Sequence, residues 1–211
     1  MFSNTWIPET IALTHLITLG WVGMVMFGAL YQMIPVLVGG IVAFPRLSQL
    51  MHTMMIPAIL LMASGFFWNH YMLLKTALIL LFLAIFFFLL QLVPPLVRAD
   101  GSRPLVLAMR LALGCLGLTL LMGSLNLAQY SGWWPGIIDR NMLKTVHLLM
   151  GLLGWIGCLI FGVGFHVIPM FYLSKPFPES RARGILLSGF GSLLALSLGI
   201  ILEWNKELLL L

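Results

Sequence analysis

Six long apolar segments dominate this sequence and leave few possibilities for its fold. They cover residues 10–35, 47–68, 71–97, 104–130, 141–172 and 180–204. A helix needs about 20 apolar residues to cross the hydrocarbon core of a bilayer, and every segment reaches that length. The sequence therefore predicts an all-α integral membrane protein with six transmembrane helices, in a multi-pass arrangement.

Composition excludes the main alternatives to this fold. Of the 211 residues, 61% are hydrophobic and 8% are charged, against roughly 25% charged in an average soluble domain. Spanning β-barrels alternate polar and apolar residues, and these segments do not. Six spanning helices need roughly 120 apolar residues, which nearly exhausts the supply and leaves almost nothing for an extramembrane domain. We therefore expect a single transmembrane domain over residues 1–211. The net charge of +5 comes from residues spread over loops, and it does not indicate nucleic-acid binding.

The basic residues predict the orientation, because cytoplasmic loops of membrane proteins carry an excess of Lys and Arg. The loops after the first, third and fifth segments, with the adjoining helix ends, hold Arg46, Arg98, Arg103, Arg110, Lys175, Arg181 and Arg183. The opposite side holds Lys75, Arg140, Lys144 and Lys206. Seven against four places the first group in the cytoplasm of a bacterial-type inner membrane. Both termini are then outside.

The fifth segment repeats part of the first. Residues 19–35 and 153–169, offset by 134, are identical at eight of seventeen positions, and Tyr31 and Gln32 correspond to Phe165 and His166. A two-residue insertion before the shared Leu-Gly-Trp sequence also aligns His15 with His147. The repeat predicts a four-helix module that is present once in full and then in part, with units of approximately 1–134 and 135–211. Repeats in membrane proteins often share a site at their interface.

Histidines inside the predicted helices are the candidate functional residues, because ionisable groups within a membrane usually serve a function. His15 lies one to two turns, and His147 about one turn, from the predicted outer ends of the first and fifth segments. Two imidazoles at one depth are typical of a six-coordinate, low-spin haem. The alternative is a pair of core histidines that bind carbonyls or water.

Glycines follow both histidines and offer room for a flat porphyrin. Gly151 and Gly154 share the face of His147 at i+4 and i+7, and Gly20 and Gly23 follow His15 less strictly. The alternative for these glycines is close helix packing.

Other residues have weaker assignments. His52 and His166, near the predicted inner ends, are candidates for a second haem, with local hydrogen bonding as the alternative. His70, Lys75, Arg140 and Lys144 lie on the outer side and are candidate partners of haem propionates, with solvation or interface anchoring as the alternative.

Four methionines near His52 have thioethers that could bind copper (Met51, Met54, Met55 and Met62). Methionine is also a flexible core residue, so we do not expect copper. Cys115 and Cys158 fall in apolar stretches and are expected in the core.

These motifs resemble subunit I of the haem–copper oxidase superfamily, which includes bacterial nitric oxide reductases. The first segment carries His15-Leu-Ile-Thr-Leu-Gly-Trp, Phe27-Gly-Ala-Leu-Tyr-Gln-Met-Ile-Pro35 and then Phe44-Pro-Arg-Leu47. The resemblance places His15 on the family's low-spin haem histidine. His147 matches the first histidine of the family's His-x-His pair by its distance to Pro169. In the oxidases the second histidine of that pair binds the low-spin haem, but this chain has Leu149 at that position. Assigning the ligand role to His147 therefore requires a slight shift along the helix.

The chain lacks the family's oxygen-reducing motifs. It contains no His-His dipeptide and no His-x-x-x-Tyr sequence, and beside a low-spin pair it cannot provide three histidines at one depth for copper. The resemblance therefore implies a shortened relative that holds haem b without the haem–copper centre. We expect an electron-transfer protein or a subunit of an oxidoreductase rather than a complete oxidase.

Three partners and two other functions fit this interpretation. The electron partner would be a quinol, a periplasmic cytochrome c or a partner subunit. A five-coordinate haem that binds or reduces nitric oxide or oxygen is one alternative function, and a copper-handling or assembly protein is the other. The glycine- and serine-rich face of the sixth segment predicts a homodimer or a partner subunit (Gly184, Ser188, Gly191, Ser192 and Ala195).

Overall fold

The computed structural model describes residues 7–100, 103–136 and 138–209, with side chains as far as Glu203. Within these ranges the chain is helical and contains no strand. The elements in chain order are α1 (Pro8–His15), η1 (Leu16–Gly23), α2 (Met24–Met33), η2 (Ile34–Val38), α3 (Leu47–Phe67), α4 (Tyr71–Arg98), α5 (Pro104–Tyr130), α6 (Arg140–Leu148), η3 (Leu149–Gly157), α7 (Cys158–Phe171) and α8 (Glu179–Leu209).

The elements join into six helices that are long and apolar enough to cross a membrane, which confirms the predicted fold class. They run over Pro8–Val38, Leu47–Phe67, Tyr71–Arg98, Pro104–Tyr130, Arg140–Phe171 and Glu179–Glu203. Each begins within two residues of its predicted start. The protein is therefore a multi-pass membrane protein.

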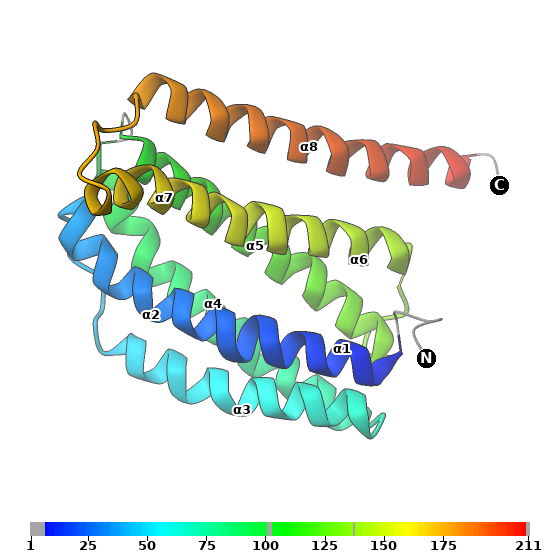
Figure 1. Cartoon of the computed structure of the whole chain (residues 1–211). Helices are drawn as coiled ribbons and strands as arrows, with labels where there is room; N and C mark the ends of the chain where they lie inside the picture. The colour runs from blue at the N-terminus through cyan, green and yellow to red at the C-terminus, as the bar shows by residue number, and fades with distance from the viewer. Residues whose placement is uncertain (1–6, 101–102, 137, 210–211) are drawn as a thin grey trace. The chain divides into compact units, whose positions relative to one another are not determined.

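The first and fifth of these helices contain π-helical segments, which the sequence analysis did not predict. In Figure 1 each appears as one continuous rod, from α1 through α2 and from α6 through α7. Inside the first rod lies η1, with 8 residues, and inside the second lies η3, with 9 residues. Long π-helices are rare, and π-type bonding occurs frequently at functional sites.

The chain divides into two compact units. Unit 1 comprises Met1–Pro95 and Leu127–Pro135, and unit 2 comprises Leu96–Asn126 and Gly136–Leu211. The change between Pro135 and Gly136 lies beside the predicted repeat boundary at 134/135. Unit 2 also includes residues 96–126, which the repeat assigned to the first module. The single domain remains a prediction.

Unit 1 is built on α3 and α4. A core cluster joins Ala12 of α1, Met62 and Phe66 of α3, Leu74 of α4 and Leu127 of α5, all buried. This packing of α1 against α3 positions the helix that carries His15.

The loop between η2 and α3 is held onto α4 by a hydrogen bond that a proline makes available. Pro95 has no N–H, so the carbonyl of Gln91, four residues earlier, loses its helical donor. The backbone N–H of Ala43 donates to that carbonyl at 3.2 Å. Gly40 lies against the same proline, because a Cβ added at Gly40 would be 2.7 Å from Pro95 Cβ. The loop therefore has a fixed position beside α4.

Unit 2 is held together by close helix contacts and by one arginine. Arg110 of α5 donates hydrogen bonds to the carbonyls of Leu96, Val97 and Ala99 at 2.7–3.2 Å. These carbonyls lie at and just beyond the C-terminal end of α4 and lack intrahelical donors. Arg110 therefore caps α4, in addition to contributing positive charge to the predicted cytoplasmic side.

The last helix, α8, packs on unit 2 through one narrow face. Ala182, Leu186, Leu193 and Ser197 are buried on it. The five small residues of the predicted contact face are all exposed, and nothing lies within 4 Å of a Cβ added at Gly184 or Gly191. The homodimer or partner subunit on this face remains a prediction.

Candidate functional site: two histidines at α-to-π junctions

His15 lies at the last position of α1, directly before η1. Its imidazole is half-buried, and Nδ1 donates a hydrogen bond to the carbonyl of Ile11 at 2.8 Å. The ring lies beside Phe66 of α3 in a nearly parallel orientation, with 6.3 Å between ring centroids. Phe66 in turn contacts Tyr130, with 5.4 Å between centroids. An aromatic cluster of unit 1 therefore orients this histidine.

His147 lies in the last turn of α6, two residues before η3. Its Nδ1 donates a hydrogen bond to the carbonyl of Thr119 on α5, at 2.9 Å. The ring lies on Gly123 of the same helix: a Cβ added at Gly123 would be 2.7 Å from Cε1 and 2.8 Å from Nδ1 of His147. A glycine at position 123 is therefore required for this position of the imidazole.

The two histidines share their protonation pattern. A carbonyl oxygen only accepts hydrogen bonds, so Nδ1 of each ring must carry the proton. The lone pair then resides on Nε2, the nitrogen that binds a metal ion when Nδ1 donates to a carbonyl. His15 and His147 thus have the tautomer that a haem ligand requires. They belong to different units, and a haem that they share remains a prediction.

Three of the four glycines after the histidines lie against neighbouring helices. A Cβ added at Gly154 would be 2.6 Å from Sγ of Cys115, and one at Gly151 would be 3.3 Å from Thr119. Gly20 faces Ile59 at 3.5 Å, and Gly23 faces the backbone of its own helix at 3.0 Å from the Thr18 carbonyl. These contacts favour helix packing for Gly154. Contact of any of these glycines with a porphyrin remains a prediction.

The other candidate residues occupy separate places. His52 is half-buried, and its Nδ1 donates to the Ser48 carbonyl at 2.7 Å. Exposed His70 accepts a hydrogen bond from the Leu73 N–H at 3.4 Å, as a cap for the start of α4. His166 is exposed near the end of α7.

The three basic candidates for propionate binding differ in their surroundings. Lys75 is half-buried in the second turn of α4. Arg140 is exposed at the start of α6, and its backbone carbonyl accepts a hydrogen bond from Asn126 at 3.4 Å. Lys144 is half-buried one turn further along α6. Binding of propionates by any of them remains a prediction. Lys206, which entered the charge count, lies beyond the described side chains.

Cys115 and Cys158 are buried free thiols, as expected. The methionines around His52 include three buried ones, Met51, Met55 and Met62. Among the described residues, no group of three or more His, Cys, Asp or Glu side chains is arranged to hold a metal ion.

Each unit also contains a cavity of about 400 Å³ beside a loop. The unit-1 cavity measures 410 Å³ and is lined by residues that include Tyr31, Gln32, Ser48 and His52. The hydroxyl of Tyr31 is buried and has no hydrogen-bond partner among the described residues. Every side chain that lines the unit-1 cavity is formally uncharged when histidine is neutral.

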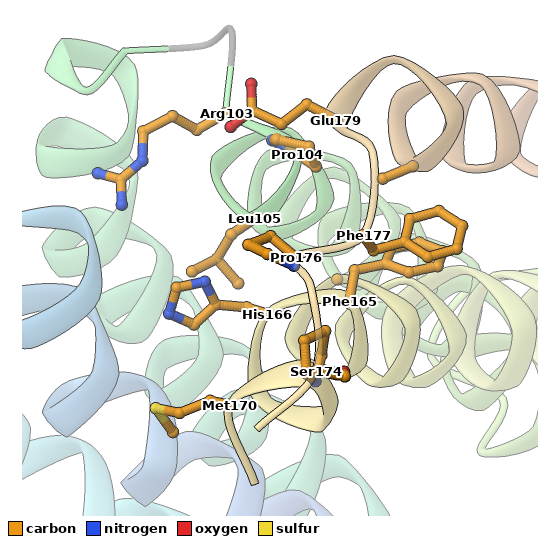
Figure 2. Close-up of a pocket in the computed structure, with 13 residues that line it drawn as sticks. Arg103, Pro104, Leu105, Phe165, His166, Met170, Ser174, Pro176, Phe177 and Glu179 are labelled. Atoms are coloured by element: carbon orange, nitrogen blue, oxygen red, sulfur yellow. The ribbon is translucent and has the colours of Figure 1, made fainter. Parts of the chain in front are cut away.

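The unit-2 cavity measures 400 Å³ and is more polar (Figure 2). It lies where α5 begins, α7 ends and α8 begins. Arg103, His166 and Glu179 line it together with Phe165 and Phe177, whose rings stack with 4.8 Å between centroids.

The two cavities occupy equivalent places in the repeat. Three pairs of lining residues come from the aligned helices: Gly28 and Gly162, Tyr31 and Phe165, Gln32 and His166. Three more come from the loops and helices that follow: Val42 and Pro176, Pro45 and Glu179, Ser48 and Ala182. All six pairs keep the offset of 134. The repeat therefore continues past Pro35 and Pro169, where sequence identity no longer indicates it.

Comparison with family models, with curated proteins and with solved structures gives no match for this chain.

Proposed function

We propose that this protein is a membrane haem b protein related to a shortened haem–copper oxidase subunit I, in which His15 and His147 bind the iron of one low-spin haem. The observation that carries the proposal is the shared local structure of the two histidines. Each stands within two residues of a π-helix that ends at the last glycine of a Leu-Gly-Trp-x-Gly sequence, at Gly23 and Gly157. Each also donates its Nδ1 proton to a carbonyl.

The π-helices help to explain why the repeat needs an insertion. Leu19 lies four positions after His15, whereas Leu153 lies six positions after His147. A π-turn takes up an additional residue, because its hydrogen bonds run from i to i+5. The second π-helix is one residue longer than the first and so absorbs part of the difference. The two histidines can thus occupy similar places relative to the Leu-Gly-Trp sequence, although the number of residues between each histidine and that sequence differs.

The residues around the histidines have distinct roles in this proposal. Thr119 and Gly123 position His147, and Ile11 and Phe66 position His15. A haem with two histidine ligands supplies reversible one-electron transfer. The proposed propionate partners are His70, Lys75, Arg140 and Lys144, and His52 and His166 are the candidates for a second haem. The electron partner would be a quinol, a cytochrome c or a partner subunit.

The proposal is tested by a pyridine haemochrome assay on protein purified in mild detergent. We expect one haem b per chain, or two if the second site is occupied, and a reduced spectrum that carbon monoxide does not change. His15→Ala and His147→Ala should each abolish the low-spin spectrum. Leu13→Ala is the matched control, because Leu13 lies on α1 beside His15 and its side chain is exposed.

Three results would contradict the proposal. Normal reduced spectra in both the His15 and His147 variants would exclude these residues as ligands. A spectrum of the wild type that carbon monoxide changes would favour a five-coordinate haem for gas chemistry. Copper in place of haem in metal analysis would favour the copper-handling alternative.

A further inference from the structure

We propose that the unit-2 cavity binds the headgroup of a membrane phospholipid that carries both a phosphate and a primary ammonium. The inference is independent of haem, because every lining residue belongs to unit 2 and neither His15 nor His147 is among them. It gives His166 a role other than that of a second haem ligand.

Three ionisable side chains line this cavity without an internal partner. Among the described residues, the side chains of Arg103, His166 and Glu179 make no hydrogen bond and no ion pair. Two of these groups can carry positive charge and one carries negative charge. Polar groups that converge on an otherwise apolar pocket are typical of ligand sites.

The cavity lining combines charged and apolar side chains. In Figure 2 the guanidinium of Arg103 and the imidazole of His166 lie on one side of Pro176, the side of Leu105 and Met170, while Phe165 and Phe177 lie on the other. Leu105, Pro169 and Met170 complete the apolar lining. A ligand that complements this arrangement has a charged head and an apolar body.

The cavity lies at the depth of lipid headgroups, because it stands where three membrane-crossing helices begin or end. The adjacent end of α7 and the turn after it expose Met170, Phe171, Tyr172 and Leu173, whose exposed fractions rise from 58% to 95%. Exposed aromatic residues at helix ends are typical of the membrane–water interface. A lipid can therefore enter the cavity directly from the bilayer.

Comparison of the two cavities shows that charge is what distinguishes the second one. Gln32 and Pro45 of the unit-1 cavity correspond to His166 and Glu179 in unit 2, and Arg103 has no counterpart in the unit-1 lining. The same cavity architecture thus carries opposite charges in only one of its two copies. This is expected if that copy has a charged ligand.

The charges select the class of ligand. A purely anionic group would meet the carboxylate of Glu179, and a simple cation would meet the guanidinium of Arg103. A headgroup with a phosphate and a primary ammonium satisfies both, because arginine is a strong hydrogen-bond donor to phosphate oxygens and a carboxylate accepts from an ammonium.

Native mass spectrometry of the delipidated protein tests this proposal. The probes are phosphatidylethanolamine, phosphatidylcholine, whose quaternary ammonium has no N–H, phosphatidylglycerol and inorganic phosphate. We expect one tightly bound phosphatidylethanolamine, with at least tenfold weaker binding of the other three probes. Arg103→Gln/His166→Gln should weaken phosphatidylethanolamine binding at least tenfold, and Glu179→Gln should abolish the preference over phosphatidylglycerol.

Arg183→Gln is the matched control, because Arg183 is exposed near the same end of α8 but does not line the cavity. It should leave binding unchanged. Equal affinity in the double variant and the wild type would overturn the proposal. Equal binding of phosphatidylcholine would overturn the role of Glu179, and tight binding of inorganic phosphate alone would replace the lipid by a free anion. Each binding measurement is made on both haem-free and haem-containing protein, so that its result does not depend on whether haem binds.

Discussion

Gly123 of α5 makes direct contact with the imidazole of His147. A Cβ at position 123 would lie 2.7 Å from Cε1 of the ring, which is closer than side-chain atoms tolerate. The hydrogen bond from Nδ1 to the Thr119 carbonyl comes from the same stretch of α5. One short segment of a helix that is distant in sequence thus fixes both the position and the tautomer of the candidate ligand.

Gly123→Ala should therefore displace the imidazole and reduce haem occupancy severalfold. Gly114→Ala is the control, because it lies on the same helix and its added Cβ would meet nothing within 4 Å. The haem content per chain is measured on both purified variants, and we expect a loss in Gly123→Ala alone. Full occupancy in Gly123→Ala would show that the position of the His147 ring is not needed for haem binding.

Gly154 is predicted to stabilise unit 2 through contact with Cys115 rather than through the porphyrin. An added methyl group would lie 2.6 Å from Sγ and 2.7 Å from Cβ of Cys115, and overpacking of this kind costs about 1–3 kcal/mol. Gly154→Ala should lower the unfolding temperature, and Cys115→Gly in the same chain should restore much of it. Gly191→Ala on α8 is the neutral control. Loss of haem at an unchanged unfolding temperature would assign Gly154 to the porphyrin instead.

Arg110 is predicted to contribute to stability through the carbonyls that it caps. Hydrogen bonds from a charged donor are worth about 1.5–3 kcal/mol each when buried, and the guanidinium here is half-buried. Arg110→Gln should lower the free energy of unfolding by about 2 kcal/mol, and Arg110→Lys by less. Denaturation in mixed micelles measures both variants. No change in Arg110→Gln would show that water replaces the guanidinium at these carbonyls.

The predicted orientation places the loop after α7 in the cytoplasm and the loop after α5 outside. Lys175→Cys and Trp133→Cys introduce thiols at exposed positions, while the native Cys115 and Cys158 are buried. A membrane-impermeant maleimide added to intact cells should label the Trp133 variant and spare the Lys175 variant. The reverse pattern would invert the topology.

The sequence was sufficient to predict the six helices, because the length of each apolar segment alone requires a spanning helix. The repeat was also visible in the sequence, but its full extent was not. The lining pairs Pro45 with Glu179 and Ser48 with Ala182 share no residue identity, and they are related by their common offset of 134 and their common place beside a cavity.

The candidate site was predictable in part. Intramembrane position identified His15 and His147, but neither Thr119 nor Gly123 carries a sequence signal, because both lie in an ordinary apolar helix 28 and 24 residues before His147. The π-helices were equally hidden, since hydrophobic periodicity has little meaning in segments that are apolar on every face. The sequence did place Gly154 on the His147 face, but not the partner, Cys115, that occupies the space beside it.

Low-temperature electron paramagnetic resonance of the oxidised protein tests the central claim most directly, because it reports the ligands of the iron. The account predicts a low-spin ferric signal typical of two histidine ligands in the wild type, and its loss in both His15→Ala and His147→Ala. A protein without haem, or a low-spin signal that persists in either variant, would contradict it.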